Sequence, residues 1–406
     1  MQSVSTLFGF AAVALAGGCM MNHSGNVSAP PGGDVSNQAE RGSPVEELRA
    51  ACGEGAATTA GAVISRQPYL QQVTTSSAMI GWVSDSPDGE HVNVTLPDGS
   101  PVMVAAAAID DSALRVAAWR QMWVTVDGLE PDTIYCYEVA NGNLLQTRTG
   151  FRTAPASDDP APVRFLAFGD SGGGSDQRTL LDQMYDYPYD LMIHTGDIAY
   201  NSGQLFEFEE NVFGVYQDLL RNIPLFPVAG NHDYHTQNGA AFRSVFALPG
   251  DSGEKSYSYD WGRVHFVALD TEVSYATLAE WLDADLTATS APWKIVYLHR
   301  PPYSTGDHGS DTSLRNKLAP IFEKHGVQLV LAGHDHDYER MIPQNGVAYF
   351  VTGGGGRGTR PVGTSSFTAF SAEVIHFLYG EVLEDKMIIH AVDGTGTEFD
   401  SLVIAR

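Results

Sequence analysis

Residues 165–201 read FLAFGDSGGGSDQRTLLDQMYDYPYDLMIHTGDIAYN, and this stretch decides the fold. Two short apolar runs in it end in Gly-Asp, which places carboxylates at Asp170 and Asp197, and Tyr200 follows three residues later. Apolar runs of this length bounded by Gly indicate buried strands. The segment Asp176 to Tyr187 is predicted to be the crossover helix of a βαβ unit. Both carboxylates are then expected at the carboxyl edge of one sheet, where ligands bind in open α/β sheets.

A lone Gly-Asp pair is usually an ordinary turn, but three later apolar runs also end in polar residues. The run 225–229 leads into Gly-Asn-His-Asp, the run 294–298 into His299, and the run 328–331 into Gly-His-Asp-His. Such oxygen and nitrogen donors suit borderline or hard metals, and the absence of Cys argues against a thiolate site. Seven donors suit two ions about 3.5–4 Å apart that share one carboxylate. These donors are Asp170, Asp197, Tyr200, Asn231, His299, His334 and His336.

From Val163 onward, apolar runs alternate with helical stretches, which predicts a layered α/β domain. Strands are predicted at residues 191–194, 225–229, 264–269, 294–298, 328–331 and 348–352. Helices are predicted at 204–220, 276–287 and 312–325, and a late antiparallel hairpin at 374–382 and 386–392. The segment Gly353 to Gly356 is expected to form a turn near the site at the end of a strand.

The five polar segments, taken together and in order, resemble the five blocks of the calcineurin-like metallophosphoesterases. They are Gly169-Asp170, Gly196-Asp197-x-x-Tyr200, Gly230-Asn231-His232-Asp233, Val296-x-x-His299 and Gly333-His334-x-His336. Tyr200 points to the purple acid phosphatase branch. The resemblance covers about residues 66–406 and implies, for residues 161–406, an α/β four-layer sandwich of mixed β-sheets flanked by helices.

The resemblance also implies two metal ions. Asp170, Tyr200 and His336 are expected to bind Fe(III), Asp197 to bridge, and Asn231, His299 and His334 to bind divalent Fe, Zn or Mn. The chemistry agrees, because a phenol with an ordinary pKa of roughly 10 needs a strongly charged ion to lose its proton. The neutral amide of Asn231 suits the less charged ion.

The reaction that the resemblance implies is hydrolysis of a phosphomonoester by attack of a metal-bound hydroxide on phosphorus. His232 is expected to bind the phosphoryl group or to protonate the leaving oxygen, and Asp233 to orient His232. His308 is expected to face the substrate, with a solvated loop residue as the alternative. Arg300 stands where the family often has a His, which puts substrate preference in doubt. A phosphodiesterase using the same site is the second interpretation, and a non-catalytic surface binding protein is the third.

Residues 63–156 are predicted to form a separate all-β domain. Hairpin signals at Pro97-Asp98-Gly99 and Asn141-Gly142 separate short strands, as in a β-sandwich. The Leu-x-Pro-x-Thr-x-Tyr run that ends at Tyr135 resembles a fibronectin type III domain. A spacer packed on its neighbour is favoured over a binding module.

Residues 1–19 are expected to be an export signal, because a 12-residue apolar stretch from Leu7 to Gly18 is too short to span a membrane. The sequence LAGGC resembles a lipoprotein cleavage site with Cys19 as the lipidated residue, and an ordinary signal peptide is the alternative. Residues 20–62 are predicted to be a flexible linker. The protein is therefore expected outside the cytoplasm, as a secreted, periplasmic or lipid-anchored protein of the bacterial surface.

The chain of 406 residues carries a formal net charge of −26. This charge repels nucleic acid and anionic lipid, so neither is expected as a general partner, and a membrane is expected only through the Cys19 anchor. A small phosphate ester would need metal or Arg charge to bind. Cys52 and Cys136 remain after processing, and the sequence leaves open whether they pair.

Overall fold

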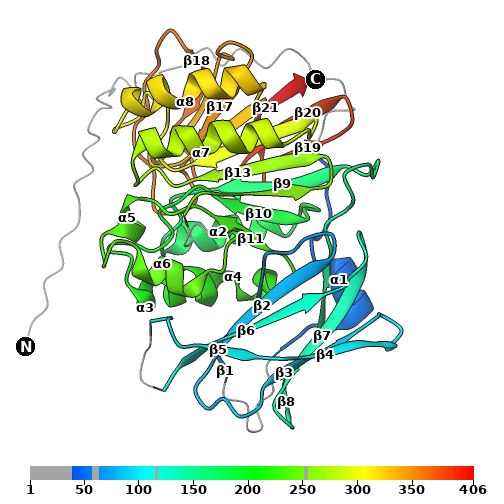
Figure 1. The fold of residues 1–406 in the computed structure, drawn as a ribbon. Coiled ribbons are helices and arrows are strands. Elements are labelled where there is room, and N and C mark those ends of the chain that lie inside the picture. Colours follow the sequence, from blue (N-terminus) through cyan, green and yellow to red (C-terminus); the bar gives the residue numbers. More distant parts are fainter. Residues whose placement is uncertain (1–38, 57–63, 115–117, 251–254) are drawn as a thin grey trace, which may run out of the picture. The chain divides into compact units, whose positions relative to one another are not determined.

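The computed structural model describes residues 39–56, 64–114, 118–250 and 255–406. The predicted signal 1–19, with Cys19, and parts of the predicted linker, 20–38 and 57–62, lie outside the described residues, as does residue 63. Residues 39–406 form one compact unit, in which an all-β part precedes a larger α/β part (Figure 1). Among the described residues, every helix is too short or too polar to cross a membrane.

The all-β part is a sandwich of two four-stranded antiparallel sheets, with strand orders β1-β2-β6-β5 and β4-β3-β7-β8. The strands are β1 (Ile64–Gln71), β2 (Ser77–Ser84), β3 (His91–Thr95), β4 (Pro101–Ala106), β5 (Ala108–Asp110), β6 (Arg120–Asp127), β7 (Ile134–Ala140) and β8 (Leu144–Arg152). The hydroxyl of Tyr135 accepts the backbone N–H of Glu130 at 2.9 Å and so fixes the corner before β7. The predicted all-β domain is present, and its fibronectin resemblance stays a prediction.

The prediction of a flexible linker is wrong for residues 39–56, which contain a packed helix. Helix α1 (Glu46–Cys52) buries the side chains of Leu48 and Cys52. The Gly- and Ser-rich composition of the segment did not reveal that this short helix packs against the rest of the protein. Cys52 forms a disulfide with Cys136 of β7, with the two Cα atoms 5.3 Å apart. The pairing that the sequence left open is therefore present, and it anchors α1 on the sandwich.

Two mixed sheets make up the α/β part, with orders β11-β10-β9-β19-β20-β21 and β12-β13-β14-β15-β17-β16-β18. The first contains β9 (Val163–Phe168), β10 (Leu191–His194), β11 (Leu225–Pro227), β19 (His376–Val382), β20 (Lys386–Asp393) and β21 (Glu398–Ala405). The second contains β12 (Tyr257–Trp261), β13 (Val264–Leu269), β14 (Trp293–Leu298), β15 (Leu329–Ala332), β16 (Tyr338–Met341), β17 (Ala348–Thr352) and β18 (Thr368–Ala372). The predicted strands and the late hairpin are confirmed.

The two sheets pack face to face and helices cover their outer faces (Figure 1). Between the sheets, the rings of Phe165 and Phe266 lie 5.9 Å apart. Helices α7 (Tyr275–Ala288) and α8 (Thr312–His325) share an apolar cluster with β13, β14 and β15. Helix α2 (Ser175–Met184) packs on the first sheet from the opposite side. This layering brings the carboxyl ends of both sets of parallel strands to one edge.

The helix predicted at 204–220 is not continuous. It consists of α3 (Leu205–Phe208), a π-helical segment at Glu209–Phe213, and α4 (Gly214–Leu220). Such single π turns insert an extra residue into the helix and rotate the side chains that follow. Sequence periodicity does not reveal this break, because both halves still bury one apolar face.

Candidate metal centre

The residues predicted as donors follow parallel strands at one edge of the two sheets. Strands β9, β10 and β11 run parallel in one sheet, and β13, β14, β15 and β17 run parallel in the other. Asp170, Asp197 and His334 each have positive φ, at 56°, 54° and 74°. Side-chain-bearing residues adopt this left-handed conformation at a cost and mainly where function requires it. The chain therefore turns sharply directly after the strands that deliver these three side chains.

One group of donors surrounds the hydroxyl of Tyr200. This oxygen lies 3.1 Å from each of three atoms, Oδ1 of Asp170, Oδ2 of Asp197 and Nε2 of His336. The His336 nitrogen is also 3.5 Å from Asp170 Oδ1. These four side chains come from three separate loops, and all four are buried.

A second group surrounds Nε2 of His299. This nitrogen lies 3.2 Å from Oδ1 of Asn231, 3.2 Å from Nδ1 of His334 and 3.3 Å from Oδ2 of Asp197. Nδ1 of His299 donates to the carbonyl of Thr195 at 3.0 Å, which directs Nε2 toward the other donors. Asp197 Oδ2 contacts both groups, so all seven predicted donors converge and Asp197 lies between the two sets.

The charges at this site fit a pair of cations. Among the described residues, the ion pairs of Asp170 and Asp197 are with imidazoles and none is with Lys or Arg. Buried carboxylates need compensating positive charge. Burial and the positive charge of His299 lower the pKa of His334 to about 2, so its ring is neutral and offers a lone pair. The donor set therefore suits borderline or hard metal ions.

Two further pKa shifts describe the same site. Burial alone would lower the pKa of His299, but the negative charge of Asp197 raises it to about 10. Burial and the carboxylates of Asp170 and Asp197 raise the pKa of Tyr200 well above its usual value. A phenol in this setting gives up its proton only to a strongly charged cation.

His232 lies beside the donors, as predicted for a residue that meets the substrate. Its backbone N–H donates to Oδ1 of Asp197 at 2.8 Å, and its ring lies 4.5 Å from the ring of Tyr200. Its Nδ1 is 2.8 Å from the carbonyl oxygen of Asn201. A carbonyl only accepts, so Nδ1 carries the proton and Nε2 faces the site, 4.0 Å from Asp197 Oδ2.

Asp233 does not orient His232, and that prediction is corrected. Its buried carboxylate accepts the backbone N–H groups of Ile198 at 3.1 Å, Ala199 at 2.9 Å and Gly230 at 2.8 Å. Adjacent side chains on a short helix point in different directions, which is why neighbours in sequence do not meet here. Asp233 instead fixes the loop that carries Asp197.

His308 lies at the rim of the site. Its ring lies 4.1 Å from the ring of His334, and its Nδ1 is 3.1 Å from Oδ1 of Asp335. One guanidinium nitrogen of Arg360 lies 3.1 Å from Nδ1 and 3.3 Å from Nε2 of the same ring. The structure therefore places His308 next to the predicted donor His334.

Sequence reasoning missed Arg357, and it named Arg300 without predicting the contact that Arg300 makes. Arg357 lies over the ring of Tyr200 at 4.6 Å and hydrogen-bonds the side chain of Asn201. Arg300 forms a bidentate ion pair with Glu272, at 2.7 and 3.0 Å. The available signal for Arg357 was its place directly after the glycine turn 353–356, which was expected near the site.

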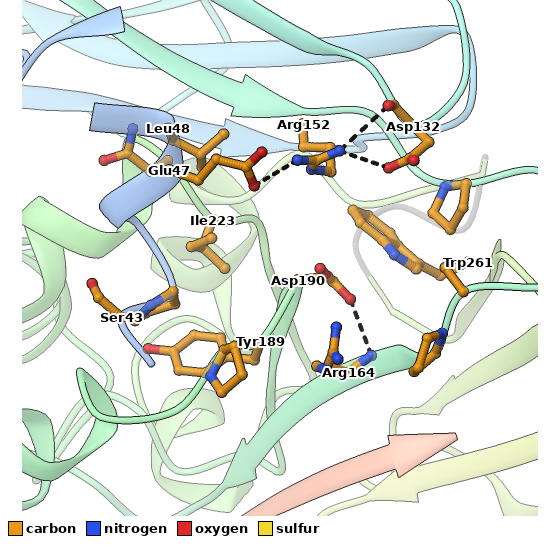
Figure 2. A pocket seen from close by; sticks show the side chains of 16 residues that line it. Ser43, Glu47, Leu48, Asp132, Arg152, Arg164, Tyr189, Asp190, Ile223 and Trp261 are labelled. Carbon is orange, nitrogen blue, oxygen red and sulfur yellow. Dashed lines mark hydrogen bonds and ion pairs between the residues drawn. The ribbon is translucent and has the colours of Figure 1, made fainter. Parts of the chain in front are cut away.

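A pocket of about 290 Å³ lies apart from the donors, among α1, β8, β9 and Trp261 (Figure 2). Arg152 in its wall pairs with Glu47 at 2.7 Å and Asp132 at 2.9 Å. None of the seven donors lines this pocket. The charges on Arg152 are thus already paired, and the metal centre is elsewhere.

Comparison with known proteins shows which family part of the chain is similar to. Residues 163–338 match the family described as calcineurin-like phosphoesterase, and this segment contains all seven donors. This segment is therefore similar to the domains of that family. The match covers less than half of the chain.

Particular relatives narrow the class further. The chain is 28% identical over 282 residues to purple acid phosphatase 23 of Arabidopsis thaliana, covering 57% of this chain and 62% of the relative. It is 27% identical over 301 residues to acid phosphatase type 7 of Homo sapiens, covering 66% and 68%. The structure of a purple acid phosphatase from yellow lupin seeds shares the fold, with a TM-score of 0.75 and 20% identity over 84% of this chain and 74% of that one. These similarities support a metal-dependent phosphoric ester hydrolase.

Proposed function

We propose that this protein is a phosphatase that hydrolyses phosphomonoesters at a dimetal site. The observation that carries the proposal is the convergence of seven donors, with Asp197 Oδ2 between the Tyr200 group and the His299 group. The proposed ligands are Asp170, Tyr200 and His336 for Fe(III), Asp197 as the bridge, and Asn231, His299 and His334 for divalent Fe, Zn or Mn. When bound, such ions stabilise charge on phosphoryl oxygens and activate water.

The side chains around the donors supply binding and proton transfer. The N–H at Nδ1 of His232 is engaged by Asn201, so a second proton on Nε2 can be donated to the leaving oxygen. The backbone N–H of His232 holds Asp197 in place at 2.8 Å. His308, next to His334, is proposed to contact the substrate.

The decisive experiment combines metal analysis with a substrate panel. Purified protein should contain two metal ions per chain and hydrolyse phenyl phosphate faster than the matched diester. Asp197→Ala should lose both ions, because it removes the atom shared by both donor groups. A protein that binds two ions and prefers the diester would support a phosphodiesterase. A protein that holds metal and hydrolyses neither would contradict an enzymatic function.

We also propose that the protein acts outside the cytoplasm. The disulfide between Cys52 and Cys136 supports this proposal, because such bonds persist in oxidising compartments. Mass analysis of the natively expressed protein is the test. Cleavage before Cys19 with a diacylglyceryl group would support a lipid anchor, and an intact Met1 would contradict export.

A further inference from the structure

Two arginines belong to the loop that follows β17, and backbone hydrogen bonds tie this loop to the site. The N–H of Gly355 donates to Gly169, and the N–H of Arg357 donates to Asp170, both at 2.9 Å. The N–H of Arg360 donates to the carbonyl of His336, also at 2.9 Å. Arg357 and Arg360 are therefore held at the rim of the metal centre.

Arg357 and Arg360 have weak or no carboxylate partners among the described residues, unlike the arginines that form close ion pairs. Arg300, for example, pairs with Glu272 at 2.7 Å. Arg357 has no ion pair within 4.0 Å among the described residues, and the carboxylate partner of Arg360 is Asp307 at 3.9 Å. The Asp307 side chain is 69% exposed, so solvent screens this contact. In a chain with a net charge of −26, the loop is a local source of positive potential.

Arg360 is better placed than Arg357 to receive an anion. The guanidinium of Arg357 already binds the Asn201 side chain and stacks on Tyr200. One nitrogen of Arg360 lies at nearly equal distances from both nitrogens of His308, so it rests against the ring and leaves its other N–H groups for a ligand. His308 in turn separates Arg360 from His334. An anion bound to Arg360 would therefore lie farther from the predicted metal donors than the scissile phosphoryl group.

We propose that Arg360 and His308 form a subsite for a second anionic group, a carboxylate or phosphate, in the organic part of the phosphomonoester. This inference rests on the proposed phosphatase function and names a substrate class for the same site. Arginine binds both kinds of anion through paired N–H donors, and such charge-assisted hydrogen bonds are about twice as strong as neutral ones. The subsite selects doubly anionic substrates over singly anionic ones.

The test uses 3-phosphoglycerate and glycerol 3-phosphate, which differ only by a carboxylate in place of a hydroxymethyl group. The ratio of their kcat/KM values is measured with metal-loaded protein. Arg360→Gln should lower this ratio about 10-fold, because one charge-assisted contact is lost. Arg360→Lys should keep part of the preference for 3-phosphoglycerate. Added salt should lower the kcat/KM ratio in the wild type but not in Arg360→Gln.

Lys324→Gln is the matched control. Lys324 lies in the last turn of α8, near the amino end of β15 and thus at the opposite edge of the sheet, and it pairs with Asp283. If Lys324→Gln lowers the kcat/KM ratio as much as Arg360→Gln does, the effect is due to net charge. If Arg360→Gln lowers kcat/KM equally for both substrates, Arg360 acts on the scissile phosphoryl group. Either result overturns the proposed subsite. If the wild type hydrolyses neither compound and also fails on phenyl phosphate, the phosphatase proposal fails. The subsite is then tested by measuring the affinities of both compounds by calorimetry. If Arg360→Gln does not change the ratio of the two affinities, the proposed subsite is overturned.

Discussion

At the scale of single residues, Asp197 organises the site because each of its oxygens has a separate task. Oδ1 accepts the backbone N–H of His232, while Oδ2 lies between Tyr200 and His299. The neighbouring Gly230 leaves the necessary space, since a Cβ there would come within 2.2 Å of Asp197 Oδ1. A glycine in this motif is therefore a steric requirement of the carboxylate.

Replacing His232 tests its proposed role as an acid. His232→Ala should lower kcat by about 10²–10⁴-fold on alkyl phosphates and less on substrates with good leaving groups. Metal content should persist, because the backbone N–H that holds Asp197 survives the substitution. His235→Ala is the control, since Nδ1 of His235 also lies near the Asn201 carbonyl, at 3.2 Å. Loss of metal, or unchanged rates on alkyl phosphates, would exclude the acid role.

Tyr200→Phe tests the proposed phenolate ligand. Oxidised, iron-loaded wild type should absorb visible light through charge transfer from the phenolate to Fe(III), and the variant should be colourless. Asp170, Asp197 and His336 remain, so some iron should stay bound, with a weaker preference for Fe(III) over divalent ions. Absorption spectra and metal analysis of the two proteins are the measurements. A colourless wild type with full iron occupancy would reject the phenolate ligand but not a dimetal phosphatase.

The sequence could predict the donors but not the residues around them. All seven predicted donors lie in the loops after parallel strands, whose carboxyl ends share one edge of each sheet. Arg360 reaches the site through a backbone bond to His336 and a contact with His308, and neither relation has a local pattern. For Asp233 the sequence instead predicted a contact that is absent. Asp233 is next to His232 in the sequence, but the helix directs the two side chains away from each other.

At the scale of elements, strands were easier to predict than helices. Buried parallel strands carry continuous apolar runs, and β13 is fully buried along its length. Helix α8 was also predictable, because Asp311 caps its start through the N–H of Leu314 and Gly326 ends it at a φ of 63°. The π-helical segment escaped prediction, because the helices on both sides of it still bury one apolar face. Its Glu209 pairs with Arg66, 143 residues away in the sequence.

The pH dependence of β13 gives a prediction at this scale. His265 lies 2.7 Å from Asp260 and 2.9 Å from Asp285; burial alone would lower its pKa, but these carboxylates raise it to about 9. This raised pKa stabilises the fold below about pH 6.5 and the contribution is lost as pH rises toward 9. His265→Gln should remove on the order of 2 kcal/mol of pH dependence over this range, allowing for the exposed Asp260. Urea unfolding across this pH range measures it, and parallel curves for both proteins would contradict the assignment.

At the scale of the whole molecule, the sandwich and the α/β part are joined by buried polar contacts. The hydroxyl of Tyr69 donates to the carbonyl of Val245 at 2.6 Å, and that of Tyr137 to the carbonyl of Arg221 at 2.8 Å. Arg66 of β1 pairs with Glu209 of the π-helical segment. These contacts favour the interpretation of the sandwich as a spacer that packs on the α4 side of the α/β part.

Arg66 offers the sharpest test of this coupling. Its side chain is 3% exposed and that of Glu209 is 17% exposed, so Arg66→Met leaves a largely buried carboxylate without its partner. Such a loss costs about 3–5 kcal/mol. Urea unfolding followed by tryptophan fluorescence should show this loss, and a single transition should separate into two because the parts no longer unfold together. Arg66→Met/Glu209→Gln should recover most of the stability, since no buried charge remains unpaired. A loss below about 0.5 kcal/mol, the range of surface substitutions, would mean that the two parts are joined by their apolar contacts alone.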